Sequence, residues 1–144
     1  MKSLGQTGQD IWKAWLLERR FGGDQALLER TLQEFLYPVR DKILDRANLQ
    51  GNETLLDVGC GDGLVGFGAL ERLQAGRVIF SDISQKLLDH SAQLAQQMSV
   101  ADRCEFVQAS AEDLVAIPNG SVDVVTTRSV LIYEIGRASC RERV

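Results

Sequence analysis

Cysteine and histidine are scarce in this sequence. Its 144 residues include a single histidine and three cysteines, at positions 60, 104 and 140, and the cysteines form no C-x-x-C pair. Such a pattern supplies neither the pairing of a disulfide framework nor the ligand spacing of a zinc site. We therefore expect reduced thiols, no metal site and a cytoplasmic location.

Long apolar runs and an excess of positive charge are also missing. Residues 1–9 contain no hydrophobic core of a signal peptide, and no stretch approaches the ~18 apolar residues of a membrane span. The 16 Lys and Arg residues are outnumbered by 20 Asp and Glu residues, so the formal net charge is −4. We expect no membrane insertion and no nucleic-acid binding through a basic surface, and the oligomeric state stays open.

What is present is the composition of one soluble globular domain, with 44% hydrophobic and 25% charged residues. Short apolar segments alternate with helical patterns, and four of them are expected to be strands: 54–58, 77–81, 104–108 and 122–127. Helices are expected over 64–73 and after Ser84, with a short helical turn over 111–115. This alternation predicts βαβ units, and therefore an α/β fold with a parallel sheet.

Three helical segments precede the first strand. The first covers 10–20 with Asp10 as its N-cap. Asp24 is expected to cap the second segment, and Pro38 to interrupt it before a third begins. These helices either form a packed cap or also help to shape a substrate pocket.

The stretch around which the chain is organised is 55–63, LLDVGCGDG, an apolar strand that runs into a glycine turn. Two patterns overlap there. One is the dinucleotide form G-x-G-x-x-G over 61–66, with an acidic residue, Asp82, 19 residues past Gly63. The other is acidic-x-G-x-G-x-G over 57–63. Glycine positions alone do not decide between them.

The charges of the turn do favour one pattern. A dinucleotide would bring a pyrophosphate close to the carboxylates of Asp57 and Asp62, and like charges ~5 Å apart repel by roughly 3 kcal/mol at an effective dielectric constant of ~20. S-adenosylmethionine instead carries an ammonium and a sulfonium group, which the same carboxylates attract. The acidic residues therefore indicate a cationic ligand.

With these residues the stretch resembles motif I of the class I, Rossmann-like, S-adenosylmethionine-dependent methyltransferases, and the later segments keep the family's order. The resemblance implies a doubly wound parallel sheet, of which this chain supplies about four of seven strands. It also implies S-adenosylmethionine as methyl donor and methyl transfer to an acceptor, which we expect to be a small molecule. A nicotinamide-dependent oxidoreductase and a non-catalytic ligand-binding module are the alternatives.

The resemblance assigns roles to the residues of the turn. Asp57 is expected to receive the methionine ammonium, directly or through water. The glycines at 59, 61 and 63 let the backbone approach the ligand, so Gly59, Gly61 and Gly63 are counted as binding residues. Asp62 occupies a position where the family often has a polar contact.

The ends of the second and third strands are expected to hold the nucleoside. Asp82 matches the acidic residue that accepts both ribose hydroxyls, and Ile83 would flank the adenine. After the third strand the family often has Asp-Ala, whereas this chain has Ser110-Ala111-Glu112. The Ala111 N–H would then bond the adenine edge, while either Ser110 or Glu112 accepts from the exocyclic amine.

The fourth strand ends at Arg128 and Ser129, which are expected to line the sulfonium or the acceptor site. Arg128 is more readily aimed at substrate or at a neighbouring carboxylate than at a cationic sulfonium. No residue stands out as a general base.

The last segment, 134–144, EIGRASCRERV, resembles the conceptual translation of a sequencing adapter. We therefore divide the chain into an N-terminal helical cap, 1–50, an incomplete donor-binding domain, 51–133, and an artefactual tail. On this interpretation the chain is a truncated and inactive N-terminal portion of a methyltransferase.

Overall fold

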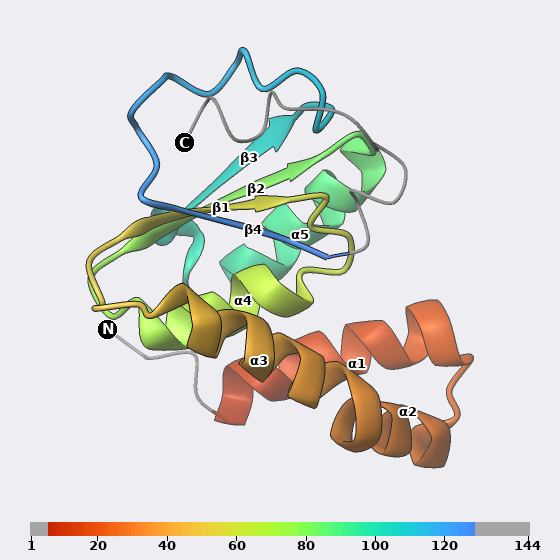
Figure 1. The fold of residues 1–144 in the computed structure, drawn as a ribbon. Helices are drawn as coiled ribbons and strands as arrows, with labels where there is room; N and C mark the ends of the chain where they lie inside the picture. Colours follow the sequence, from red (N-terminus) through yellow and green to blue (C-terminus); the bar gives the residue numbers. More distant parts are fainter. Residues whose placement is uncertain (1–5, 129–144) are drawn as a thin grey trace.

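A computed structural model describes residues 6–128 and contains a four-stranded, fully parallel sheet in the order β3-β2-β1-β4 (Figure 1). The helices are α1 Gln6–Phe21, α2 Gln25–Thr31, the π-helical segment η1 Leu32–Leu36, α3 Tyr37–Ala47, α4 Leu64–Arg72, α5 Gln85–Gln97 and the 3₁₀ turn η2 Ala101–Arg103. The strands are β1 Thr54–Val58, β2 Arg77–Asp82, β3 Cys104–Gln108 and β4 Val124–Thr127. The expected α/β fold with a Rossmann-like parallel sheet is confirmed.

Strand β1 lies inside the sheet between β2 and β4. Asp57 is opposite Phe80 on one side and Thr126 on the other, and Val58 is opposite Ser81 and Thr127. Four of the five residues of β1 are buried, as expected for a parallel strand covered on both faces. The register brings the carboxyl ends of all three strands to one edge.

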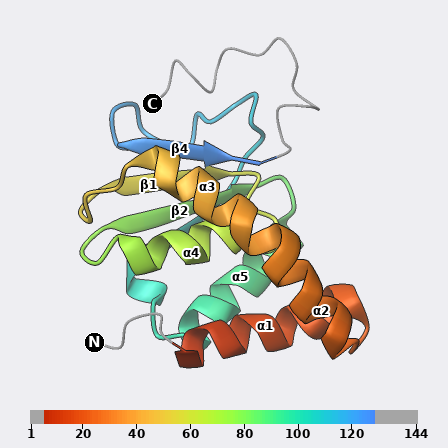
Figure 2. The same ribbon diagram turned by 60° about the horizontal axis from the view of Figure 1, so that its bottom comes forward.

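The sheet and two helical layers on one of its faces form three layers. Helices α4 and α5 pack directly on the strands, and α1 to α3 lie over these two helices, with α3 also in contact with β4 (Figures 1 and 2). One apolar cluster runs through all three layers and includes Leu16, Leu32, Leu70 and Phe80, which are almost fully buried. No helix within residues 6–128 combines the length and the apolarity needed to cross a membrane.

The opposite face of the sheet is covered by the segment 109–123. Its apolar residues Leu114 and Ile117 pack on Leu56 and Ile79. The helical turn expected over 111–115 is wrong, because this segment consists of turns with an isolated bridge between Ser110 and Asp113.

Side chains explain why no helix forms there. The Ser110 hydroxyl accepts a hydrogen bond from the Glu112 N–H at 3.1 Å, and the Asp113 carboxylate accepts one from the Val115 N–H at 3.2 Å. Such local bonds satisfy backbone donors without a helix.

Two expectations about the N-terminal helices also fail. Helix α1 begins at Gln6 rather than at an Asp10 cap, and Gln9 on the added turn donates to Glu71 of α4 at 2.8 Å. Pro38 does not interrupt the helix, because it lies in the first turn of α3, directly after the π-helical segment. The wider turn bonds Tyr37 N–H to the carbonyl of Leu32, five residues back, and so accommodates a residue that lacks an N–H. The expected Asp24 cap is confirmed.

The fourth strand is shorter than expected, since it starts at Val124 and not at residue 122. Asp123 instead forms two hydrogen bonds with the first residue of β1. Its N–H donates to the carbonyl of Thr54 at 2.9 Å, and its carboxylate accepts from the Thr54 N–H at 2.9 Å.

Close packing of α4 on β2 depends on Gly66. A Cβ atom at this position would overlap the ring of Phe80, which is fully buried and stacked on Phe106 at 5.1 Å between centroids. We expect Gly66→Ala to lower the free energy of unfolding in urea by about 1 to 2 kcal/mol, because the helix or the ring must shift.

Gly68 in the same helix is the matched control. A Cβ atom there meets only the flexible side chain of Arg40, so Gly68→Ala should be neutral or slightly stabilising through its higher helix propensity. Equal losses for the two variants would contradict a specific role of Gly66.

Candidate functional site

The turn between β1 and α4 requires glycine at alternate positions. Gly59, Gly61 and Gly63 have φ values of 67°, 52° and 85°, in the left-handed region that other residues adopt at a cost. Two backbone bonds fix the turn: Cys60 N–H to the carbonyl of Ser81, and Gly63 N–H to that of Cys60, both at 2.9 Å. The three glycines of the acidic-x-G-x-G-x-G pattern are thus explained by backbone conformation.

Asp82, the last residue of β2, connects this turn to the next helix. One carboxylate oxygen accepts from Gly61 N–H at 3.0 Å and the other from Ser84 N–H at 2.9 Å. The residue is 8% exposed. Each oxygen still has a lone pair, so Asp82 is able to accept two further hydrogen bonds from a ligand.

Asp57, on the adjacent strand, is buried within the sheet at 3% exposure. The Thr126 hydroxyl donates to its Oδ1 at 3.0 Å. Burial raises the pKa of Asp57 to about 7, although the hydroxyl, the Gly66 N–H and the charge of Arg128 favour the ionised form. A cation brought to this carboxylate would lower its pKa and strengthen the attraction.

Asp62 is placed differently from its neighbours. Its carboxylate forms ion pairs with Arg19 Nε at 2.9 Å and Arg20 Nη1 at 2.7 Å, and its carbonyl accepts from Trp12 Nε1 at 2.9 Å. Two guanidinium groups pair with this carboxylate, whereas Asp57 and Asp82 form no ion pair with an Arg or Lys side chain within residues 6–128.

The expected nucleoside contacts follow β2 and β3 at the same edge. Ile83 is 73% exposed, and its carbonyl accepts from the Gln108 side chain at 3.1 Å. Ser110 is half-buried, Ala111 is buried and Glu112 is exposed. The structure thus places a large apolar side chain on the surface beside Asp82.

Two hydroxyls that the sequence did not single out lie beside the end of β1. Ser81 and Thr127 are the partners of Val58 in the flanking strands, and their hydroxyl oxygens are buried without a hydrogen-bond partner in the part of the chain that the structure describes. Arg128 follows and is half-buried, whereas Ser129 lies outside the described residues. The described residues contain no group of three His, Cys, Asp or Glu that could hold a metal ion.

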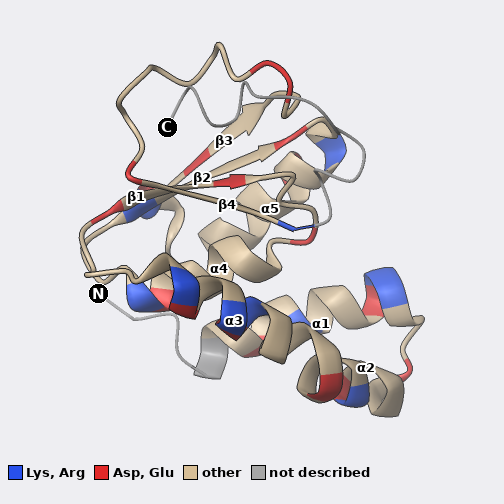
Figure 3. Ribbon diagram, in the orientation of Figure 1, with Lys and Arg blue, Asp and Glu red and all other residues tan. Residues whose placement is uncertain are grey.

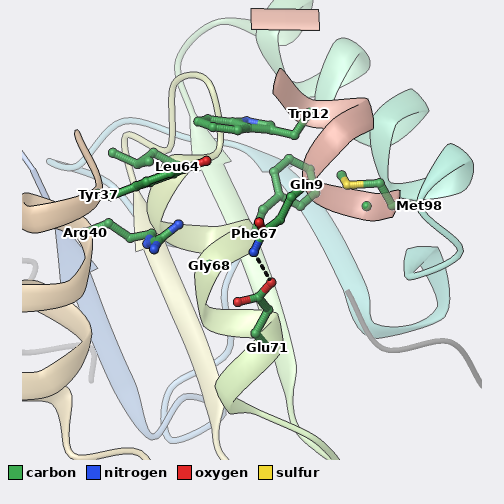
Figure 4. Close-up of a pocket in the computed structure, with 10 residues that line it drawn as sticks. Gln9, Trp12, Tyr37, Arg40, Leu64, Phe67, Gly68, Glu71 and Met98 are labelled. Atoms are coloured by element: carbon green, nitrogen blue, oxygen red, sulfur yellow. Dashed lines mark hydrogen bonds between the residues drawn. The ribbon is translucent and has the colours of Figure 1, made fainter. Parts of the chain in front are cut away.

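A groove runs between α1, α3 and α4 and begins at the turn (Figure 4). Trp12 and Leu64 lie at one end of the groove, and the hydrogen-bonded pair Gln9 and Glu71 lies at the other. Its volume is about 330 Å³, which includes space open to solvent.

Two contacts of the site join residues that are far apart in the sequence. Thr126 is 69 positions from Asp57, and the α1 residues that contact Asp62 are at least 42 positions from it. The only local signal was an amphipathic helix rich in tryptophan and arginine. Nothing in that pattern indicates which loop the helix contacts.

The glycine turn is hydrogen-bonded to the acidic residue that ends β2, at the carboxyl edge of a parallel sheet. This arrangement is typical of a nucleotide-binding site. Comparison with known proteins specifies its class. A family model described as a methyltransferase domain matches residues 55–142. The chain belongs to the class I S-adenosylmethionine-dependent methyltransferases.

Individual relatives agree with this assignment. Nocamycin O-methyltransferase of Saccharothrix syringae is 35% identical over 69% of this chain and 35% of its own length. The tRNA 5-carboxymethoxyuridine methyltransferase of Escherichia coli K12 is 28% identical over 69% of this chain and 37% of its own. The chain therefore spans about a third of these relatives.

Among solved structures, geranyl diphosphate C-methyltransferase from Streptomyces coelicolor A3(2), in complex with S-adenosyl-L-homocysteine, aligns with a TM-score of 0.60 at 22% identity, over 67% of this chain and 36% of that one. This likeness is one of fold. The family match does not favour the nicotinamide-dependent alternative that the G-x-G-x-x-G pattern left open.

Proposed function

We propose that this chain holds S-adenosylmethionine over the carboxyl ends of β1 and β2, and that the protein transfers the methyl group to a small-molecule acceptor. The observation that carries the proposal is the pair of nearly buried carboxylates, Asp57 and Asp82, on either side of the glycine turn. In this proposal residues 51–133 form the donor-binding domain and residues 1–50 a helical cap.

Each carboxylate has a separate role in the proposal. Asp82 accepts the two ribose hydroxyls with the lone pairs left over from Gly61 and Ser84. Asp57 attracts the methionine ammonium, and its burial favours contact through water. At its three glycine positions the turn has no side chain, so the backbone can come close to the ligand there.

The remaining contacts belong to the adenine and to the acceptor. Ile83 covers one face of the adenine, and the Ala111 N–H, with Ser110 or Glu112, contacts its edge. Arg128, whose charge acts on Asp57, faces that carboxylate or the acceptor.

When bound, S-adenosylmethionine would supply an activated methyl group: the O, N, S or C atom of the acceptor forms a bond to the methyl carbon in line with the carbon–sulfur bond, which breaks as S-adenosylhomocysteine leaves. Because the leaving group is already a good one, the work of the protein is alignment and exclusion of water. The buried strand ends and the covering helices serve both purposes. We assign no general base within residues 6–128.

A small acceptor is supported by the likeness to nocamycin O-methyltransferase. The tRNA-modifying relative makes a nucleic-acid acceptor the second candidate. Over the described residues, however, Lys and Arg are interspersed with Asp and Glu on the outer helices (Figure 3). An interspersed surface is poorly suited to binding a phosphate backbone.

Titration calorimetry on the 144-residue chain tests the donor assignment. S-adenosylhomocysteine should bind with one-to-one stoichiometry, because it presents the same ribose and ammonium groups as the donor, and NADH should give no heat of binding. Binding of NADH alone would refute the assignment.

A further inference from the structure

Helix α1 is tied to the glycine turn by three hydrogen bonds that all end on Asp62. Arg19 and Arg20 each occupy one carboxylate oxygen, at 2.9 and 2.7 Å, and the Trp12 indole donates to the carbonyl at 2.9 Å. The Asp62 side chain is 13% exposed. Two cations and an indole N–H therefore hold both the side chain and the backbone of one turn residue.

The sequence of α1 orients these donors. Trp12, Arg19 and Arg20 are seven and eight positions apart, so they lie on one face of the helix. Arg19 is also held over the ring of Trp15, with its guanidinium carbon 5.4 Å from the ring centroid. Both arginines lie in the last turn of α1, where the helix dipole favours positive charge.

The position of Asp62 makes this contact relevant to the donor. It lies between Gly61, whose N–H donates to Asp82, and Gly63, the N-cap residue of α4. A turn with three glycines has many conformations when it is free, and ordering it on ligand binding costs affinity. A turn that is ordered before the ligand binds avoids that loss of affinity.

In Figure 4, Trp12 of α1 lies beside Leu64, the first residue of α4.

We propose that Trp12, Arg19 and Arg20 are positioning residues of the donor site, which act through Asp62, so that docking of α1 and donor binding favour each other. The inference rests on the proposed function for its ligand. The expected change in affinity is opposite to that of a simple charge effect. Removing two positive charges near a cationic ligand would strengthen binding, whereas loss of positioning weakens it.

The test is a mutant cycle with the double substitution Arg19→Gln and Arg20→Gln, the substitution Asp62→Asn, and all three together. We expect the arginine double variant and Asp62→Asn each to bind S-adenosylhomocysteine about five- to tenfold more weakly in calorimetry. The triple variant should lose no more affinity than either of them. Amide hydrogen exchange of residues 59–63 in the ligand-free chain should accelerate in all three. Arg77→Gln, which breaks an exposed ion pair at the start of β2, is the control and should change neither quantity.

Two further variants separate positioning from general destabilisation. Replacing both arginines with lysine keeps the charges and should restore most of the affinity, and Trp12→Phe keeps the packing but should accelerate exchange in the turn. Additive losses in the cycle, stronger binding by the arginine variant, or unchanged exchange of the turn would overturn the inference. Failure of the unmodified chain to bind S-adenosylhomocysteine would refute the donor assignment instead, and the exchange comparison would still decide the positioning role.

Discussion

Replacement of Asp82 by alanine is expected to weaken S-adenosylhomocysteine binding by at least about a hundredfold. On the proposed assignment the variant loses two charge-assisted hydrogen bonds to the ribose, each worth about 1.5 to 3 kcal/mol. The substitution also removes the acceptor of the Gly61 N–H, which helps to fix the glycine turn. Calorimetry measures the affinity, and circular dichroism verifies that the variant is folded.

Asp123 provides a matched control for this substitution. Its carboxylate likewise accepts a backbone N–H, that of Thr54 at 2.9 Å, but at the amino end of the sheet. Asp123→Ala should therefore show a comparable structural loss with unchanged donor affinity. Asp82→Asn, which keeps one acceptor oxygen, should be intermediate. An Asp82→Ala variant that binds within fivefold of the unmodified chain would contradict the assigned role.

Much of this site was predictable because its signals are local. Apolar runs of five or six residues indicated the strands, and their alternation with helical segments predicted that the strands run parallel. The glycines at 59, 61 and 63 are needed for a backbone conformation that a sequence pattern records directly. The caps at Asp24 and Ser84 likewise depend on residues three positions apart.

The failures have one physical cause, which is that tertiary contacts and local side-chain bonds override helix propensity. Ser110 and Asp113 satisfy backbone donors in turns, so the segment over the sheet is not helical. A π-helical turn accommodates Pro38, and contact with α4 extends α1 beyond Asp10. The ion pairs of Asp62 with Arg19 and Arg20, more than 40 residues away, are a separate tertiary contact that no local pattern indicates.

The substitution Asp57→Asn should stabilise the fold at alkaline pH while it weakens donor binding. Burial raises the pKa of this carboxyl from 3.8 to about 7. The unfolded chain releases the proton near pH 4, but the folded chain retains it until about pH 7. Stability therefore falls between these values, by up to roughly 4 kcal/mol, and stays lower at higher pH. Asparagine does not titrate, and its amide can still pair with the Thr126 hydroxyl.

Urea unfolding at two pH values measures this effect. The gain in unfolding free energy for Asp57→Asn should be larger at pH 8 than at pH 5.5 by about 2 kcal/mol. Thr126→Val should show the opposite dependence, because loss of the hydroxyl that favours the ionised carboxylate raises the pKa further and costs more at pH 8. A gain for Asp57→Asn that is equal at both pH values would mean that the buried carboxyl ionises normally. Donor affinity of the same variant should fall, so the carboxylate at the centre of the sheet lowers stability where it supports binding.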